Sequence, residues 1–159
     1  MANFWQTSMF MQQNLSFFAI PAYWILTLVP HNYAISVMKK ANNNRWNNSN
    51  PRSSKWDQSL RDSTPAEAYG RYERAEAAHK NGMENFPVFV GAILAGTIAK
   101  LNPSTLNSFV VAYLLSRVAY TYVYVSVTSH RYSYFRTAIW LVGATMCLTT
   151  YTVAGLNLA

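Results

Sequence analysis

The chain has 159 residues, enough for one domain at about 100–200 residues each. Apolar residues make up 51% of it and charged residues only 12%, against roughly 25% in soluble domains, so an ordinary soluble protein is not expected. The net charge of +7 comes without a basic stripe or nucleic-acid motif, which argues against nucleic acid as a partner, and the single cysteine, Cys147, excludes an intrachain disulfide framework.

The first apolar run, at about residues 15–38, is predicted to span a membrane. It is long enough for the roughly 20 residues that a bilayer requires. Pro21 and Pro30 predict kinks in this helix, and Lys39 and Lys40 end it at the interface. A signal peptide has a basic region before its apolar run, and this chain has none. We therefore expect the run to remain in the protein as a membrane anchor.

The next segment, about 39–69, is predicted to be a cytosolic loop. Its Asn-rich part, from 41 to about 63, has too few apolar residues to order itself around a core, so we expect it to be solvated. Thr64, Pro65 and Glu67 resemble the start of a helix, with Thr64 as the N-cap and Pro65 at the first helical position.

Three further spans are predicted at about 70–101, 106–128 and 134–155. The apolar part of the second is too short to cross a bilayer alone, so the polar segment before it should continue the same helix. Together the four spans predict one domain over residues 1–159, an all-α integral membrane protein built as a bundle of four transmembrane helices.

The loop charges orient these spans. Nine of the 13 Lys and Arg residues fall between Lys39 and Lys80, the second loop has only Lys100, and Arg131 and Arg136 flank the third. Because cytoplasmic loops carry the excess of positive charge, we expect the first and third loops in the cytosol and both termini on the other side.

Charged residues crowd the start of the second span, between Arg74 and Glu84. Helical spacing places five residues on one broad face, namely Glu73, Ala77, Lys80, Asn81 and Glu84. A salt-bridged helix end at the interface would explain part of this pattern. Glu84 lies deepest, just before an apolar run, where a carboxylate requires a buried partner or a ligand.

The third and fourth spans offer companions for this cluster. Arg117 lies mid-span within a stripe of tyrosines, Tyr113, Tyr120 and Tyr124, and we expect it to pair with Glu84 or another buried acid. Structural pairing and direct ligand contact both remain open for Arg117.

Arg136 and Thr137 begin the fourth span. Arg136 can be an interfacial anchor, or it can stabilise an anion or thiolate at a helix N-terminus; spacing alone does not separate these roles. The spacing of His, Cys, Asp and Glu predicts no metal-ligand set.

Three motifs carry a family resemblance. The segment from Arg74 through His79, Asn81 and Glu84 to Pro87 resembles the second-helix signature of the MAPEG family, the membrane-associated proteins in eicosanoid and glutathione metabolism. The stretch from Arg117 to Tyr124 is similar to its third-helix motif, and the stretch from Arg136 to Gly143 to its fourth-helix motif. The likeness extends over about residues 15–157.

The resemblance implies a homotrimer of four-helix subunits in the endoplasmic reticulum, with glutathione bound between neighbours near the cytosolic face. It implies that Glu84 holds the glutathione amino group and that Asn81 and the nearby cations hold its other polar groups. Arg136 with Thr137 would stabilise the thiolate. The remaining implied glutathione-binding residues are Lys39, Arg74, Lys80, Arg117, Tyr120 and Tyr124.

The implied activity is glutathione-dependent transfer or peroxide reduction on a lipophilic substrate from the bilayer, as in microsomal glutathione transferases. The alternative is a non-catalytic lipid-binding or scaffold protein of the same fold. Four departures from the family pattern bear on this choice: Ala77 stands where some members carry Arg, Gly82 where several carry an acid, Tyr120 where some carry His, and Thr137 where Ser is common.

Overall fold

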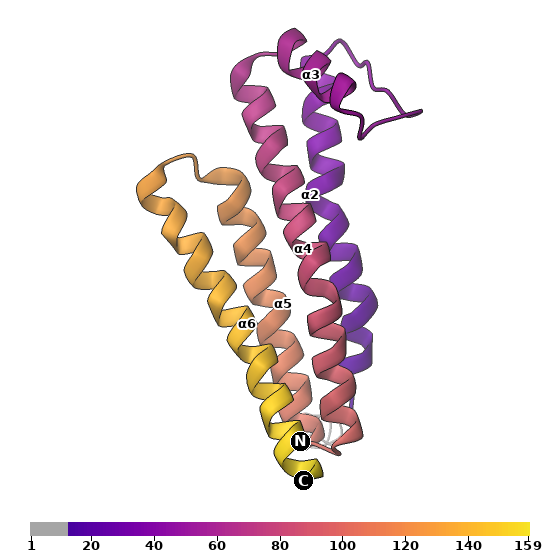
Figure 1. Cartoon of the computed structure of the whole chain (residues 1–159), viewed down its shortest axis with the longest axis vertical. Coiled ribbons are helices and arrows are strands. Elements are labelled where there is room, and N and C mark those ends of the chain that lie inside the picture. The colour runs from indigo at the N-terminus through magenta and orange to yellow at the C-terminus, as the bar shows by residue number, and fades with distance from the viewer. Residues whose placement is uncertain (1–12) are drawn as a thin grey trace, which may run out of the picture.

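The computed structural model describes residues 13–159, and this part of the chain is helical, without strands. Four long helices run side by side along the molecule, and a short helix lies across the end where two of them extend beyond the others (Figure 1). The elements in chain order are a 3₁₀ turn η1 (Ser16–Phe18), α2 (Ala19–Ala41), α3 (Ser54–Ser63), α4 (Ala66–Ile98), α5 (Pro103–Ser126) and α6 (His130–Leu158).

Two of the described helices are long and apolar enough to cross a membrane, over Pro103–Ser126 in α5 and Arg131–Leu158 in α6. The other two long helices have no apolar stretch of this length, because His31 and Asn32 interrupt α2 and the charged cluster occupies the first half of α4. The predicted spans in α2 and α4 therefore remain predictions, whereas the helices themselves lie where the sequence placed them.

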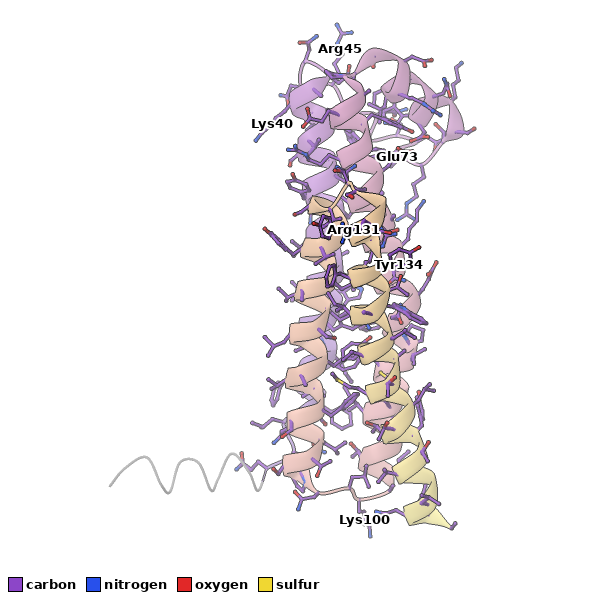
Figure 2. The ribbon with its side chains drawn as sticks, turned by 90° about the vertical axis from the view of Figure 1, so that its left-hand side faces the viewer. Lys40, Arg45, Glu73, Lys100, Arg131 and Tyr134 are labelled. Carbon is purple, nitrogen blue, oxygen red and sulfur yellow. The ribbon has the colours of Figure 1, made fainter. Side chains whose placement is uncertain are left out.

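The polar and apolar parts of α4 form one continuous helix, as expected. Its 33 residues extend over about 50 Å, which exceeds the roughly 30 Å of a bilayer core. If α4 spans the bilayer as predicted, one of its ends stands outside the hydrocarbon. Lys40, Arg45 and Glu73 gather at the end where α3 lies, and Lys100 lies at the opposite end (Figure 2).

The expectation of a solvated loop over 41–63 was wrong, because α3 forms inside it. The Ser53 side chain caps this helix by accepting a hydrogen bond from the backbone N–H of Trp56 (3.2 Å). Leu60 is fully buried in a cluster with Met38 of α2. Although the segment has few apolar residues, Trp56 and Leu60 are four apart and share one face, which is enough to dock a short helix.

The predicted start of the second span was also wrong in detail. Thr64 ends α3 instead of capping α4, since its hydroxyl donates to the carbonyl oxygen of Leu60 (2.7 Å). Pro65 is the N-cap residue of α4. Glu67 forms an ion pair with Arg71 (3.1 Å) on the exposed surface of the first turns.

An aromatic core joins α2, α4 and α5. The Tyr23 and Tyr113 rings meet edge-on at 5.2 Å, and the Phe89 ring stacks on Tyr113 at 4.2 Å. The Tyr23 hydroxyl donates to the backbone oxygen of Gly82 (3.1 Å). Such aromatic contacts add about 0.5–1.5 kcal/mol each beyond area burial, so this cluster fixes how the three helices stand relative to one another.

Gly82 allows α2 and α4 to approach closely. A Cβ atom at this position would lie 2.9 Å from the Thr27 side chain, closer than real Cβ contacts allow. The residue therefore faces α2, and a larger side chain is excluded by packing. Packing against α2 therefore accounts for a glycine at position 82, where several relatives carry an acidic residue.

Candidate functional site

A line of cationic and aromatic side chains runs along α5 to the first turns of α6. The Arg117 guanidinium lies 4.8 Å from the Tyr113 ring centre and 5.5 Å from that of Tyr120. Tyr120 contacts Tyr124 edge-on at 5.5 Å, and the Arg136 guanidinium lies 4.0 Å from the Tyr124 ring centre. Five residues that the sequence singled out are therefore in continuous contact.

Arg117 does not form the predicted ion pair with Glu84. The ion pairs among the described residues are His31–Glu76 and Arg71–Glu67. Arg117 is 2% exposed, and only its Nη2 atom has a hydrogen-bond acceptor, the Trp140 carbonyl at 3.4 Å.

The position of the Arg117 guanidinium depends on Gly143 of α6. A Cβ atom on Gly143 would collide with Arg117 Nη2, so the missing side chain makes the space that the guanidinium fills. The faces of Tyr113 and Tyr120 offer it cation–π contact in place of a carboxylate. The sequence could not show this, because Gly143 is distant along the chain and is contributed by another helix.

A second group of predicted residues lines a groove beside α4. This open cavity of about 930 Å³ lies between α4, the middle of α2 and the segment with α3. Lys80, Glu84 and Ala77 line it, as expected from their shared helical face. Further charged or aromatic groups in its wall are Trp24, His31, Trp46, Arg52, Asp57, Glu73 and Glu76.

The part of this α4 face that carries Lys80 and Glu84 is open. Toward the C-terminal end of α4, the Tyr151 hydroxyl of α6 donates to the Val88 carbonyl oxygen (3.1 Å). Glu84 and Lys80 are the next residues of the same face toward the charged end, since they precede Val88 by four and eight positions. Both are exposed.

Tyr120 connects the two groups. The charges of Glu84 on α4 and Arg136 on α6 both act electrostatically on its phenol. A guanidinium and a carboxylate thus both lie within electrostatic reach of one tyrosine. A zwitterionic ligand with an acidic group at one end and an ammonium at the other would match this arrangement.

Three predicted site residues lie elsewhere or have other partners. Lys39 is exposed at the end of α2 and lines neither described cavity. The Asn81 side-chain oxygen accepts a hydrogen bond from Asn85 Nδ2 (3.2 Å). Thr137 is exposed, and it makes no hydrogen bond with another residue of the described chain.

Arg74 joins α4 to the end of α5. Its Nε–H donates to the Val125 carbonyl oxygen (3.1 Å), one of the last carbonyls of α5. We therefore expect Arg74→Gln to lower the free energy of unfolding by about 1.5 kcal/mol, the lower end for a hydrogen bond to a charged group. Thermal unfolding in mild detergent measures this loss. Arg71→Gln, which breaks only an exposed pair, should change stability by less than about 0.5 kcal/mol, and an equal effect of both variants would contradict the assignment.

The groove wall contains a pair of histidines, His31 of α2 and His79 of α4. His31 Nδ1 lies 2.6 Å from Glu76 Oε1, and the His79 Nδ1–H donates to the Thr27 carbonyl oxygen (2.8 Å). The two rings lie 4.9 Å apart. These contacts tie α2 to α4 beside the groove. The only sequence signal was the spacing of Glu76 and His79, three residues apart on one helix.

Two tyrosines close the groove near α3. Burial raises the pKa of Tyr69 to about 12, and the hydrogen bond that its hydroxyl donates to Asp57 (3.0 Å) adds to the rise. Burial also raises the pKa of Tyr72 to about 12, and the charge of Glu76 adds to it. Both phenols are therefore held neutral in the folded chain.

These pKa shifts predict a loss of stability in alkali. Ionising Tyr69 is harder in the folded than in the unfolded chain, so its contribution is complete below pH 10.0 and is lost as the pH approaches about 12. We expect the thermal midpoint to fall between about pH 10 and pH 12, and to fall less steeply in Tyr69→Phe. Tyr132→Phe, which alters an exposed ring on α6, is the control. An unchanged slope in Tyr69→Phe would contradict this role of the phenol.

Comparison with known families supports the resemblance of the motifs. The sequence model of the MAPEG family matches residues 17–156. Comparison with curated proteins and with solved structures gives no match. The matched range includes all four long helices and both groups of candidate residues, and it leaves out only short ends of the chain. The chain belongs to the MAPEG family, membrane proteins of eicosanoid and glutathione metabolism.

Proposed function

We propose that this protein binds glutathione along the open face of α4 and uses it for transfer to, or peroxide reduction of, a lipophilic substrate. The observation that carries the proposal is the position of Arg136, whose guanidinium lies 4.0 Å over the Tyr124 ring, and Tyr124 in turn contacts Tyr120 edge-on at 5.5 Å. Glu84 is the group for the peptide's ammonium, and Lys80 beside it is a group for a carboxylate.

The chemistry requires a thiolate. A free thiol at pH 7 is mostly protonated, and the thiolate is the nucleophile. The guanidinium of Arg136 stays charged and can donate to sulfur, and each unit by which a cation lowers a thiol's pKa corresponds to about 1.4 kcal/mol. The sulfur would attack an electrophilic carbon of a substrate held in the apolar surroundings, which expels a leaving group or takes up a proton. With a peroxide, the sulfur would attack an oxygen and break the O–O bond, releasing the alcohol and leaving a sulfenic acid; a second glutathione would then reduce it to glutathione disulfide and water. Thr137, next in the chain, is the proposed hydroxyl partner.

The lipophilic substrate is proposed to arrive from the bilayer along α6. Exposed aromatic and aliphatic side chains surround Arg136 in sequence and on the helix surface, among them Tyr132, Phe135 and Leu141. An exposed apolar helix surface of this kind is expected to contact lipid tails. The cation therefore lies where a water-soluble peptide and a membrane-dissolved molecule can meet.

The assembly belongs to the same proposal. We propose that the single domain of residues 1–159 forms a homotrimer in the endoplasmic reticulum membrane, with the charged end of α2 and α4 in the cytosol. In the single chain the groove beside α4 is open, and Lys80 and Glu84 in its wall are exposed. A neighbouring subunit would supply the missing wall.

Glutathione binding tests the proposal first. We expect isothermal titration calorimetry of the purified protein to detect glutathione binding, and Glu84→Gln to weaken it at least about tenfold, because a charged hydrogen bond is worth about 1.5–3 kcal/mol. Glu67→Gln removes an exposed carboxylate outside the groove and should bind like the unaltered protein. Equal affinities in all three proteins would overturn the placement at Glu84.

The second candidate is a non-catalytic lipid-binding protein of the same fold. Ala77 favours it, because this groove residue provides no charge where some relatives carry Arg. This candidate predicts no heat of glutathione binding, together with phospholipid that co-purifies and stabilises the protein.

A further inference from the structure

A second, smaller cavity lies between α2 and α4 at the charged end of the molecule. Its volume is about 340 Å³, and it shares no residue with the groove. Tyr33, Ser36 and Lys40 contribute from α2, on the opposite face from the groove residues Trp24 and His31. The helix pair therefore has an acid-rich cavity on one side and a separate cavity on the other.

The polar groups of this second cavity are hydrogen-bond donors. Lys40 provides an ammonium, Arg71 a guanidinium and Tyr33 a phenol that makes no hydrogen bond with another described residue. The Ser36 hydroxyl already donates to the Tyr33 carbonyl oxygen (2.7 Å). An anion with several oxygen acceptors is the complementary ligand.

Arg71 is available to such a ligand. Its one carboxylate partner is Glu67, and the two side chains are 46% and 84% exposed. Ion pairs this exposed contribute little, about 0–1 kcal/mol, so exchanging Glu67 for a stronger anion costs almost nothing. The guanidinium also has donors beyond the Nη2 atom that Glu67 occupies.

The rest of the cavity is apolar. Val37 and Ala41 of α2 and Ala68 of α4 line it, and the first two pack on the buried cluster around Met38. An apolar surface beside two cations suits the boundary between a headgroup and its acyl chains. The volume lies at the lower end of small-ligand sites, which suits a headgroup better than a larger molecule.

The cavity also lies at the right level for a headgroup. It is at the end of α2 where Lys40 and Arg45 gather, opposite to Lys100 (Figure 2). There α2 and α4 extend beyond the turn between α5 and α6 (Figure 1). Basic pockets between helices on the cytoplasmic side are where anionic lipid headgroups bind.

We infer that this cavity binds the phosphate of an anionic phospholipid headgroup through Lys40, Arg71 and Tyr33. The site is independent of the proposed glutathione site, because the two cavities have no residue in common. Through this site the protein retains anionic lipids in preference to zwitterionic lipids at the edge of the helix bundle.

A lipid titration tests this inference. The full-length protein in mild detergent is titrated with short-chain phosphatidylglycerol, and separately with phosphatidylcholine of the same chain length, with bound lipid counted by native mass spectrometry. We expect phosphatidylglycerol to bind more tightly, and Lys40→Gln or Arg71→Gln to weaken it about fivefold each and about 25-fold together. Tyr33→Phe, which removes only the hydroxyl, should also weaken it.

The controls separate the cavity from general charge. Arg45→Gln combined with Lys55→Gln removes two cations from the same end and should change the affinity less than about twofold at physiological salt. Inorganic phosphate should compete only weakly, because it lacks the apolar contact. Equal binding of the two lipids, equal loss in the control variant, or full displacement by inorganic phosphate would each overturn the inference.

Discussion

Arg136→Ala is expected to lower kcat/KM for glutathione-dependent conjugation or hydroperoxide reduction by about 100- to 1,000-fold, the usual cost of removing a group that stabilises developing negative charge. The proposed thiolate would lose its cation. The fold should change little, because the guanidinium contributes one cation–π contact with Tyr124 to the described structure, worth about 0.5–1 kcal/mol at an accessible site. Steady-state kinetics at saturating glutathione measure the loss.

Two variants separate charge from helix position. Arg136→Lys keeps a cation without the planar fork and should retain part of the activity. Arg131→Ala removes an exposed arginine from the first turn of the same helix and should leave kcat/KM within about twofold. Full activity in Arg136→Ala, or an equal loss in Arg131→Ala, would remove Arg136 from the proposed role.

Gly82→Leu is expected to lower the free energy of unfolding by about 1–3 kcal/mol, the usual cost of overpacking. The Cβ atom alone would lie 2.9 Å from a Thr27 methyl group, and the branched side chain would force α2 and α4 apart. It would also strain the hydrogen bond that Tyr23 donates to the Gly82 carbonyl (3.1 Å). Thermal unfolding in mild detergent measures the effect.

Gly155→Leu is the matched control for this substitution. A Cβ atom at Gly155 on α6 meets no atom within 4 Å, so the new side chain has open space. Leu also favours helix over Gly, by roughly 0.5–1 kcal/mol, so this variant should be as stable as the original or slightly more so. If Gly82→Leu were equally stable, the close approach of α2 and α4 at Gly82 would be wrong.

Sequence periodicity predicted the long helices well, because apolar length and charge placement are local properties of the chain. The polar face with Lys80 and Glu84 follows from the 3.6-residue repeat alone, and the groove beside α4 agrees with it. Helical spacing also predicted that Arg117, Tyr120 and Tyr124 share one face of their helix. The structure shows that they contact one another in that order and that Arg136 of α6 contacts Tyr124.

The failures concern contacts between segments that are distant in the chain. Arg117 was expected to pair with an acid, but Gly143 on another helix makes room for its guanidinium beside tyrosine rings. Arg74 donates its Nε–H to a carbonyl at the end of α5, a partner that the sequence did not indicate, while its role toward a ligand stays a prediction. Helical spacing cannot reveal either partner, because both depend on how the helices pack.

The short helix α3 was missed for a different reason. Its segment is polar on average, and the average hides the pair Trp56 and Leu60 on one face. The fully buried Leu60 docks on α2 and α4, and Asp57 then reaches the Tyr69 hydroxyl. Two apolar residues on one face are enough to hold this short helix in place, because α2 and α4 already provide an apolar surface on which they can pack.

The departures from the family pattern now have different meanings. Gly82 is explained by helix packing, since its missing side chain faces Thr27 and not the groove. Ala77 does line the groove and changes its charge. Differences in ligand preference from relatives should therefore be sought at Ala77, and restoring an arginine there is the substitution that addresses them.

The most direct test of the proposed function is the ultraviolet absorbance of the thiolate during titration of the purified, full-length protein with glutathione at neutral pH. A rise that saturates with one glutathione per site, and is lost in Arg136→Ala while Arg131→Ala keeps it, is the predicted result. Calorimetric binding without any thiolate absorbance, or a thiolate signal that persists in Arg136→Ala, would contradict it.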